Sequence, residues 1–554
     1  MVRKEDGIYL ADIDTAGDIT ATHILIHNNG MRTAEEIEFI KSQNVNAFFN
    51  AAKEENEIRR RVQIAVKEET SSAYTPHMGS PKIVVILTEF QDVKFTINEP
   101  KKAFDQYFNT KGKFKNYNNR DTLNHSSVAQ YFSDMSSGAF TPQFEVVGPV
   151  TAPNSMAYYS GSGLARTDEK PTELVKEAIN LVQEKGLVNL SKAEYDLNND
   201  NQIDMVYVIH AGYMRNYGEN YSSSIWPRTK STNIPIDDVK SVRKYCISGE
   251  RFSTTRIAPI GVACHEFSHA LGLPDLYSED KKYFNDNQQM EFWDLMDGGE
   301  NVSSGYTPVA YTAWEKEAMG WNVDYEDLKD EDLLHADFSI PTQDYGKAYR
   351  IVNPKDEEEF IILENIQRTG WNGKIFVKNN TTGGILAYHM KYPSKTVNSN
   401  DYPNARLDPS IAVIPADGLV ESYDFINSTK DGVERTENSY YDSLRGDLFN
   451  LENGTELYDD LNLPNFCWYT GDKSDLIQGY TNRYRINKYV SFEFYGDKIW
   501  LNYITDMSTV GIRENKIETD SKAYYSIDGQ YLGTDKGKLK PGIYISNKKK
   551  VIIR

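Results

Sequence analysis

The chain has 554 residues, of which 39% are hydrophobic and 12% aromatic, so it is long enough for several domains and too apolar to be disordered. It carries 81 acidic and 61 basic residues, and the resulting net charge of -20 repels phosphate backbones, which argues against nucleic acid as a partner. No apolar run approaches the roughly 18 residues of a membrane-spanning helix, so we expect no transmembrane segment.

Residues 1–80 differ in character from the rest of the chain. A run over roughly 33–69 is dense in Glu, Lys and Arg (EENEIRRRVQIAVKEE), which predicts a solvated helix and also suits a pro-segment. The stretch SSAYTPHMGSPK contains two prolines and a glycine and predicts a linker. We therefore interpret residues 1–80 as an N-terminal segment, with a pro-segment remnant as one interpretation.

Residues 81–322 alternate between strand and helix patterns. KIVVILTEF is a continuous apolar run with β-branched residues, typical of a strand buried on both faces. The helix predicted over about 172–185 has a broad apolar face that includes Leu174 and Ala178. MVYVIHAGY, at 205–213, predicts a second buried strand. This order of elements predicts an α/β domain over 81–322.

Helical periodicity gives way to short strand patterns from about residue 336. YRIVNP, EFIILENI, GGILAYHM, YVSFEF and IWLNYIT predict an all-β, sandwich-like region, to which we assign residues 323–505. Residues 506–554 contain β-hairpin signals and form a small C-terminal β segment. Its end, GIYISNKKKVIIR, resembles the tails read by bacterial type IX secretion or surface anchoring, and an ordinary terminal hairpin is the alternative.

The sequence APIGVACHEFSHALGLPDLY carries the chemistry. Pro259 stands where a first-turn proline would begin a helix, and Gly272 stands where a C-terminal cap would end it. His265 and His269 are four residues apart and project from one helical face, as two nitrogen ligands of zinc require. Glu266 can reach a metal-bound water and take its proton as general base. Two unrelated histidines on a helix are the alternative interpretation.

The residues that follow HEFSH indicate which group of zinc enzymes this motif is similar to. HExxHxxGxxD, followed by EFWDLMDGG, resembles the metzincin clan, whose motif HExxHxxGxxH precedes a methionine turn. The resemblance implies that Asp275 is the third zinc ligand and that Met296 is an apolar floor beneath the histidines. Glu291 is a rival ligand, because thermolysin-like enzymes take a Glu from a second helix. Gly272 and the WDLM turn fit the metzincin geometry better, so we favour Asp275.

The resemblance leaves the residue that stabilises the oxyanion unidentified. Many metzincins have a tyrosine two residues past the methionine, and this chain has Gly298 there. Tyr306 and His389 are the remaining candidates, although a structural role suits each of them better.

Wider stretches resemble the immune inhibitor A-like metalloproteases of bacteria. The catalytic part of the resemblance comprises PKIVVILTEFQDVKF, SVAQYFSDMSSGAFTPQFEVVGPV, SSIWPR, CHEFSHALGLPDLY and EFWDLMDGG. FIILENIQRTGWN and GGILAYHM resemble the β-rich continuation of that family, so the similarity covers roughly 81–505. Members of the family are secreted endopeptidases. The resemblance therefore implies a zinc endopeptidase that acts on extracellular proteins or peptides, secreted by a bacterium or located at its surface.

A polar loop, YDLNNDNQIDMVYV, predicts a second metal site. Oxygen-bearing side chains stand at every second position, an arrangement that wraps a hard cation such as calcium. These side chains belong to Asp196, Asn198, Asp200, Gln202 and Asp204. The loop departs from an EF-hand, because Asn201 replaces the glycine and Tyr207 stands at position twelve. We predict a single structural calcium loop, as relatives carry at this place, and an Asx-rich turn without an ion is the alternative.

Cysteine use and the N-terminus bear on the cellular compartment. Cys246, Cys264 and Cys467 are too few for a disulfide framework, and this low count fits a cytosolic or a bacterial secreted protein. Cys264 is interpreted as a small buried apolar residue. The start MVRKEDGIYLAD shows no signal peptide, which argues against secretion unless the N-terminus is trimmed.

Taken together, these patterns predict a multidomain secreted zinc endopeptidase. Zinc on His265, His269 and Asp275 would polarise the scissile carbonyl, and Glu266 would pass a proton from water to the leaving amine. Two hypotheses compete with this one: a surface binding or adhesion protein that retains a protease scaffold, and a zinc hydrolase of non-peptide amides. The intact Glu266 counts against a scaffold without activity. No sequence feature predicts an oligomeric state.

Overall fold

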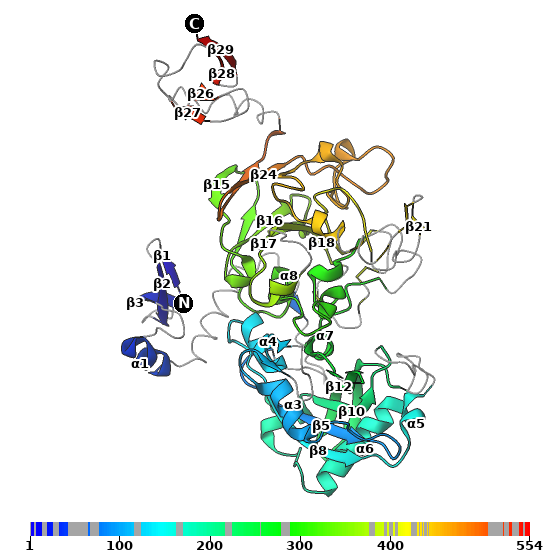
Figure 1. Ribbon diagram of the computed structural model, residues 1–554. Coiled ribbons are helices and arrows are strands. Elements are labelled where there is room, and N and C mark those ends of the chain that lie inside the picture. The colour runs from blue at the N-terminus through cyan, green and yellow to red at the C-terminus, as the bar shows by residue number, and fades with distance from the viewer. Residues whose placement is uncertain are drawn as a thin grey trace.

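The computed structural model describes residues 77–115, 123–161, 170–216, 224–254, 256–278, 288–375, 383–392 and most of 396–507. Outside these ranges it describes short pieces near the two ends (Figure 1). The N-terminal pieces are the sheet of β1 (Val2–Lys4), β2 (Gly7–Ile13) and β3 (Ile19–Leu25), helix α1 (Ala34–Ser42) and strand β4 (Ala65–Val66). The C-terminal pieces are strands β26 (Tyr524–Tyr525), β27 (Tyr531–Gly533), β28 (Gly542–Ser546) and β29 (Lys549–Ile553), which form one sheet.

The helix predicted over 33–69 is only partly found. Helix α1 lies within it, and residues 43–64 and 67–69 lie outside the described part of the chain. The prediction is wrong at β4, where Ala65 and Val66 pair in parallel with β19 (Thr396–Val397). Pairing with a distant strand overrides the local helical pattern at this β-branched position.

The predicted α/β domain is built on a seven-stranded sheet of order β11-β12-β10-β5-β8. Strands β12, β10, β5 and β8 run parallel to one another, whereas β11 is antiparallel to β12 and lies at the edge. The bounds are β5 (Lys82–Glu89), β8 (Gln143–Thr151), β10 (Val206–Tyr213), β11 (Arg228–Pro235) and β12 (Ser241–Ser253), with β9 (Gln202–Ile203) and β13 (Arg256–Ile257) pairing with β12.

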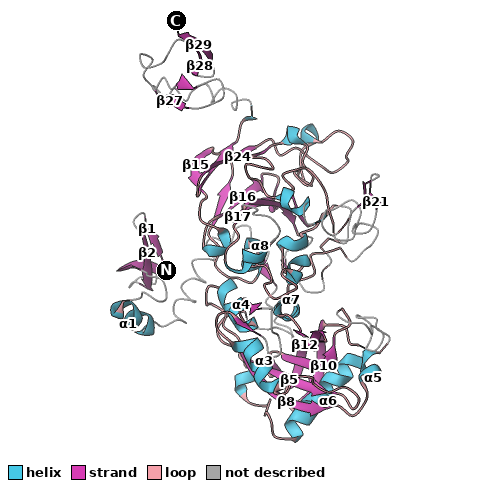
Figure 2. Ribbon diagram, in the orientation of Figure 1, coloured by secondary structure: helices cyan, strands magenta, loops and turns pink. Residues whose placement is uncertain are grey.

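Helices cover both faces of this sheet (Figure 2). One group is α3 (Pro100–Asn109), α4 (Val128–Met135) and α7 (Ile260–Leu271), and the other is α5 (Met156–Ser160) and α6 (Lys170–Glu184). Along β5, Val85 and Leu87 join the core under the first group, while Val84 and Ile86 join the core that contains Leu174 of α6. The predictions of a strand buried on both faces and of the helix near 172–185 are confirmed.

The β-rich region contains two further sheets. One has the order β14-β16-β17-β18-β20 and the other the order β15-β25-β24-β23. The strands are β14 (Tyr325–Leu328), β15 (Leu333–Asp337), β16 (Ala348–Asn353), β17 (Asp356–Ile366), β18 (Gly384–Lys391), β20 (Ile411–Val413), β23 (Glu456–Leu457), β24 (Tyr489–Tyr495) and β25 (Lys498–Ile504). Ile361 and Leu363 of β17 share one hydrophobic core with Phe492 and Leu501, so the two sheets pack face to face.

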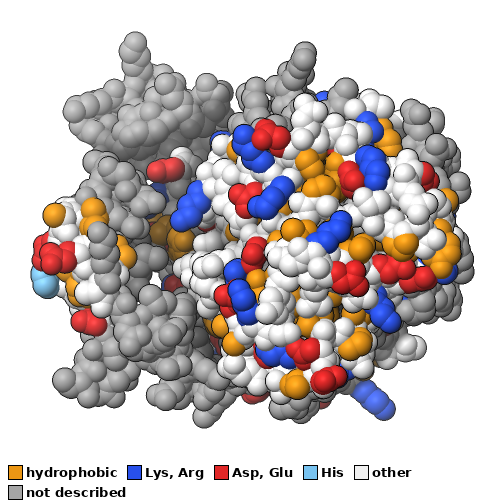
Figure 3. Space-filling model, turned by 90° about the horizontal axis from the view of Figure 1, so that it is seen from below, with side chains coloured by type: hydrophobic (Ala, Val, Ile, Leu, Met, Phe, Trp, Pro, Cys, Tyr) orange, Lys and Arg blue, Asp and Glu red, His pale blue; other side chains and the backbone are white. Residues whose placement is uncertain are grey.

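The remaining strands form short two-stranded pairs. They are β6 (Phe114–Lys115) with β7 (Leu123–Asn124), and β21 (Thr429–Lys430) with β22 (Val433–Glu434). None of the helices described is both long and apolar enough to cross a membrane. On the face shown in Figure 3, the described basic and acidic side chains are interspersed and form no continuous basic patch.

The other face of the five-stranded sheet contacts the α/β domain. Phe360 and Ile362 of β17 belong to the same core as the zinc-motif helix α7, and Tyr392 stacks on Trp314 of α8 (Ala313–Ala318) with ring centroids 5.7 Å apart. One hydrophobic core therefore continues from the α/β sheet into the β-rich region.

The three cysteines are buried and unpaired, which agrees with the interpretation of Cys264.

Candidate metal centre and active site

Helix α7 carries the HEFSH motif and has defined ends. Pro259 is the N-cap, with φ -71° and ψ 159°, so it stands one position before the helix and not in its first turn as expected. Gly272 is the C-cap as predicted, and its left-handed φ of 112° lets the chain leave the helix sharply. A Cβ on Gly261 would lie 2.0 Å from the carbonyl oxygen of Glu300, so glycine allows this loop to pack directly on α7.

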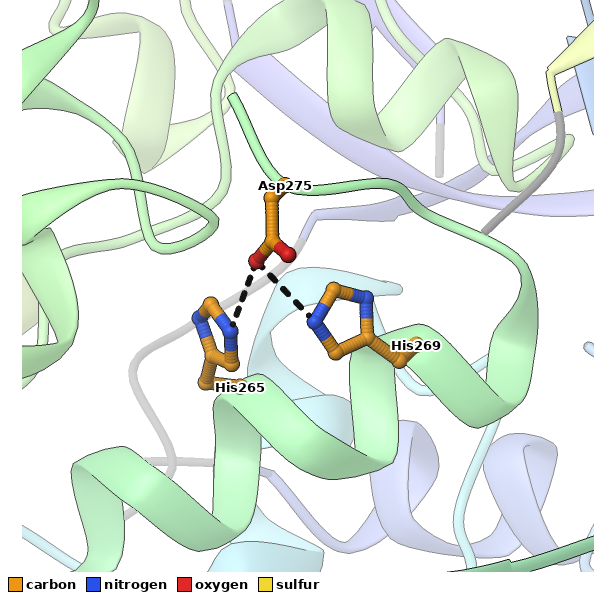
Figure 4. Close-up of side chains that lie close together, drawn as sticks. All are labelled: His265, His269 and Asp275. Carbon is orange, nitrogen blue, oxygen red and sulfur yellow. Dashed lines mark ion pairs between the residues drawn. The ribbon is translucent and has the colours of Figure 1, made fainter. Parts of the chain in front are cut away.

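The three predicted zinc ligands converge at one point (Figure 4). Oδ1 of Asp275 lies 3.2 Å from Nε2 of His265 and 3.1 Å from Nε2 of His269. Among the described residues these three form the group of His, Cys, Asp and Glu side chains that could hold a metal ion. The sharp turn at Gly272 returns the chain to the helix face and brings Asp275 opposite the histidines.

The donor set of this group fits a metal ion. Nδ1 of His265 lies 3.0 Å from the carbonyl oxygen of Leu295, and Nδ1 of His269 lies 2.7 Å from that of Leu273. Each carbonyl accepts the Nδ1 proton, so Nε2 of each ring faces Asp275 and is the atom that could bind a metal ion once it carries no proton. Oδ1 of Asp275 is buried, and no described donor is aligned to form a hydrogen bond with it. Two imidazole nitrogens and a carboxylate oxygen are the usual protein ligands of a catalytic zinc.

The charges around the group also favour a cation. Burial lowers the pKa of His265, but Glu300 and Asp275 outweigh burial and raise this pKa to about 10. Oε2 of Glu300 lies 3.8 Å from Nδ1 of His265. Burial raises the pKa of Asp275, but the two imidazoles outweigh it and hold this pKa well below its ordinary value. A buried site with several carboxylates is one that a divalent cation would stabilise.

Glu266, the predicted base, lies on the same helix and is only 6% exposed. Its Oε2 lies 2.9 Å from Oγ1 of Thr229 in the edge strand β11. Burial raises the pKa of the Glu266 carboxyl, although the two imidazoles and the threonine hydroxyl act in the opposite direction. A raised pKa suits a carboxylate that must take up a proton near neutral pH.

The methionine turn contacts both segments that carry the ligands. Met296 is fully buried, and its carbonyl oxygen accepts a hydrogen bond from the backbone N–H of Leu276, beside Asp275, at 2.9 Å. The preceding residue, Leu295, accepts the hydrogen bond from His265. The backbone of this turn therefore fixes the positions of two predicted ligands, His265 and Asp275, whereas an apolar floor formed by the Met296 side chain stays a prediction.

The rival candidates have other partners. Oε2 of Glu291 accepts a hydrogen bond from the Tyr440 hydroxyl at 2.6 Å, and Glu291 is outside the candidate ligand group. The Tyr306 hydroxyl donates to the carbonyl oxygen of Ile257 at 2.9 Å. His389 is buried in β18, with Nε2 3.0 Å from Oε1 of Glu359. Structural roles account for Tyr306 and His389.

In the predicted calcium loop, the oxygen-bearing side chains have protein partners within the loop and in the segment that begins strand β12. Asp196 forms an ion pair with Lys240 at 2.9 Å and accepts backbone hydrogen bonds from Asp200 and Asn201. Asp204 accepts from the backbone N–H of Leu197 at 3.0 Å. Nδ2 of Asn198 donates a hydrogen bond to Oδ2 of Asp200. Oε1 of Gln202 accepts one from the Ser241 hydroxyl in strand β12. This pattern is that of the Asx-rich turn, and the calcium site stays a prediction.

Two residues near the site, Thr229 and Tyr277, were not predicted from the sequence. Thr229 lies in a different element from Glu266 and belongs to no linear motif. Tyr277 follows Asp275 by two residues and is 41% exposed, and burial together with Asp275 raises the pKa of its phenol. Its place in the sequence PDLY, two residues after the predicted third ligand, was the signal available for it.

Comparison with known proteins relates part of this chain to a peptidase family. Residues 70–324 match the family model described as immune inhibitor A peptidase M6, catalytic domain. This segment belongs to the immune inhibitor A peptidase M6 family. The match confirms the resemblance drawn from the sequence and makes this segment a metallopeptidase domain.

Two relatives show how much of the chain this similarity covers. The immune inhibitor A of Bacillus thuringiensis subsp. alesti is 28% identical over an alignment of 300 residues, and the alignment covers 46% of this chain and 43% of the relative. The pre-pro-metalloprotease PrtV of Vibrio cholerae is 26% identical over an alignment of 276 residues, and the alignment covers 43% of this chain and 29% of the relative. The matched part thus spans less than half the length of either relative.

Proposed function

We propose that this chain is a zinc-dependent endopeptidase that hydrolyses peptide bonds of extracellular proteins. The observation that carries the proposal is the convergence of His265, His269 and Asp275 beside the buried Glu266, within a domain of a peptidase family. These three residues would hold the zinc. When bound, the zinc supplies Lewis-acid polarisation of the substrate carbonyl and makes a bound water more acidic.

The protein residues then perform the proton transfers. Glu266 takes a proton from the attacking water as the new C–O bond forms, and it gives that proton to the amine nitrogen as the C–N bond breaks. The carbonyls of Leu295 and Leu273 keep the two imidazoles oriented, with Nε2 toward the ligand position. Burial of Glu266 supports its role, because a carboxylate in water would hold the proton too weakly.

The edge strand β11 favours a polypeptide as substrate. β11 pairs with β12 on one side, and no described strand pairs with its other side. An extended peptide that added to this free edge would lie beside Thr229 and Glu266. A small non-peptide amide would gain nothing from such an edge.

Three finer points belong to the same proposal. We infer a metzincin-like catalytic domain, supported by the Gly272 turn, Asp275 and the methionine turn, followed by a sandwich-like pair of β sheets. We infer a secreted or cell-surface location, because one relative is named a pre-pro-metalloprotease. We also retain a structural calcium ion at the loop 196–204, supported by the alternation of oxygen-bearing side chains.

A digest of casein tests the proposal. The protein should fragment casein, lose this activity when a chelator removes the zinc, and regain it when zinc returns. Intact casein together with cleavage of a small-molecule amide would instead support the non-peptide hydrolase. If neither is cleaved while zinc is bound, removal of residues 1–76 distinguishes a latent protease from a binding protein.

A further inference from the structure

We propose that Thr229 is a positioning residue for Glu266, which acts by holding one carboxylate oxygen so that the other can exchange a proton with substrate and water. This inference rests on the proposed function. It concerns a side chain in the edge strand β11 that lies outside the zinc motif and that no sequence pattern indicates.

The contacts of Glu266 show its dependence on this hydroxyl. Oγ1 of Thr229 lies 2.9 Å from Oε2 of Glu266. Among the described residues, Thr229 is the hydrogen-bond partner of the Glu266 carboxylate, and none of the described ion pairs includes Glu266. Because Glu266 is buried, a carboxylate without this bond would lack a donor that compensates for lost hydration. The two oxygens share one plane, so a bond that fixes Oε2 also fixes the direction of Oε1.

The Thr229 hydroxyl has two possible acceptors on Glu266, and the Cys246 thiol lies close to one of them. Oγ1 of Thr229 also lies 2.5 Å from the carbonyl oxygen of Glu266, and a hydroxyl has a single proton to donate. Sγ of Cys246 lies 3.3 Å from the same carbonyl oxygen and 3.1 Å from Oγ1 of Thr229. Burial raises the pKa of the Cys246 thiol, so this thiol keeps its proton. The thiol can donate to the carbonyl alongside the Thr229 hydroxyl, whose single proton is shared between this carbonyl and Oε2 in a three-centre hydrogen bond.

The position of Thr229 explains why this bond affects the chemistry more than the fold. Thr229 pairs with Cys246 in the β11–β12 ladder, and α7 packs across the same two strands. The threonine hydroxyl therefore links the edge of the sheet, where we place the substrate, to the base on the helix. Valine has nearly the same shape as threonine and a similar preference for strands, so Thr229→Val removes the hydroxyl and little else.

The first test compares Thr229→Val with Thr229→Ser in steady-state cleavage of a peptide, with zinc content measured in parallel. Loss of a hydrogen bond to a charged group predicts a fall in kcat of about tenfold or more for Thr229→Val. We expect KM and zinc content to stay near the wild-type values and Thr229→Ser to restore most of kcat. Thr151→Val, the same change on the opposite edge strand β8, should leave kcat unchanged. A wild-type kcat in Thr229→Val, or an equal loss in Thr229→Ser, would overturn the inference.

The second test does not depend on activity. Crystal structures of the wild type and of Thr229→Val should show the Glu266 carboxylate displaced in the variant, while the two histidines stay in place. An unmoved carboxylate would contradict the positioning role. If neither the wild type nor the protein without residues 1–76 cleaves a peptide, the proposed function fails, and this comparison still decides whether Thr229 positions Glu266.

Discussion

The indole Nε1 of Trp293 donates a hydrogen bond of 2.7 Å to Oδ2 of Asp447, two residues that lie 154 positions apart in the chain. Nε2 of Gln288 donates to the same oxygen at 2.6 Å. Trp293 belongs to the segment that leads to Leu295, whose carbonyl accepts from His265. A residue beyond the matched peptidase segment 70–324 therefore supports the geometry of the candidate metal centre.

The first prediction concerns Asp447. Replacing it with leucine removes the shared acceptor and therefore two buried hydrogen bonds, those from Trp293 and Gln288, at a cost of about 1–3 kcal/mol for each. We expect Asp447→Leu to unfold at a lower urea concentration and to lose zinc faster on dialysis than the wild type. Asp447→Asn retains an acceptor of the same shape and should show a smaller effect. Equal stability and zinc retention in all three proteins would rule out this link.

The second prediction concerns the start of the peptidase domain. Nε2 of His77 lies 2.6 Å from the carbonyl oxygen of Leu271 at the end of α7, and the indole of Trp321 donates to the backbone carbonyl of His77 at 2.9 Å. Removal of residues 1–80 should therefore lower the melting temperature more than removal of residues 1–76. The two truncations differ by four residues, so melts that coincide would show that His77 does not support α7.

The zinc motif was predictable because its geometry is local. The four-residue spacing of His265 and His269, the glycine at 272 and the position of Asp275 all lie within a short stretch, and helix geometry determines their relation. The strand β5 was predictable for the same reason, since a continuous apolar run directly indicates that both faces of the strand are buried. Thr229 and Asp447 were not predictable, because only the packing of distant elements brings them to the site.

The helix predicted over 33–69 illustrates the same limit. Its charged periodicity is a local signal, and it agrees with α1. At Ala65 and Val66 the chain instead pairs with Thr396 and Val397, more than three hundred residues later. Local propensity carries no information about such a partner.

The third prediction concerns how pH changes the stabilisation of the protein by calcium at the loop 196–204. Burial raises the pKa of Asp204 to about 7, and Asp196 and Asp200 act in the same direction. In the unfolded chain this pKa is about 3.9, so without calcium the folded state binds the extra proton, and its stability falls as pH rises from about 4 to about 7. Calcium requires the ionised carboxylate. Calcium should therefore raise the melting temperature more at pH 8 than at pH 5.

The control for this prediction is Asp204→Asn. The variant has no carboxylate to ionise, so its metal-free stability should lose the part of the pH dependence that Asp204 contributes, and calcium should raise its melting temperature less. Identical melts of the wild type with and without calcium at both pH values would show that the loop is an Asx-rich turn without an ion.

The central claim is that His265, His269 and Asp275 hold a catalytic zinc and that Glu266 is the base. The most direct measurement is zinc content together with casein cleavage, for the wild type and Glu266→Ala side by side. We expect one zinc per chain in both proteins, cleavage by the wild type, and none by the variant. Cleavage by Glu266→Ala at the wild-type rate, or the absence of zinc from the wild type, would contradict this claim.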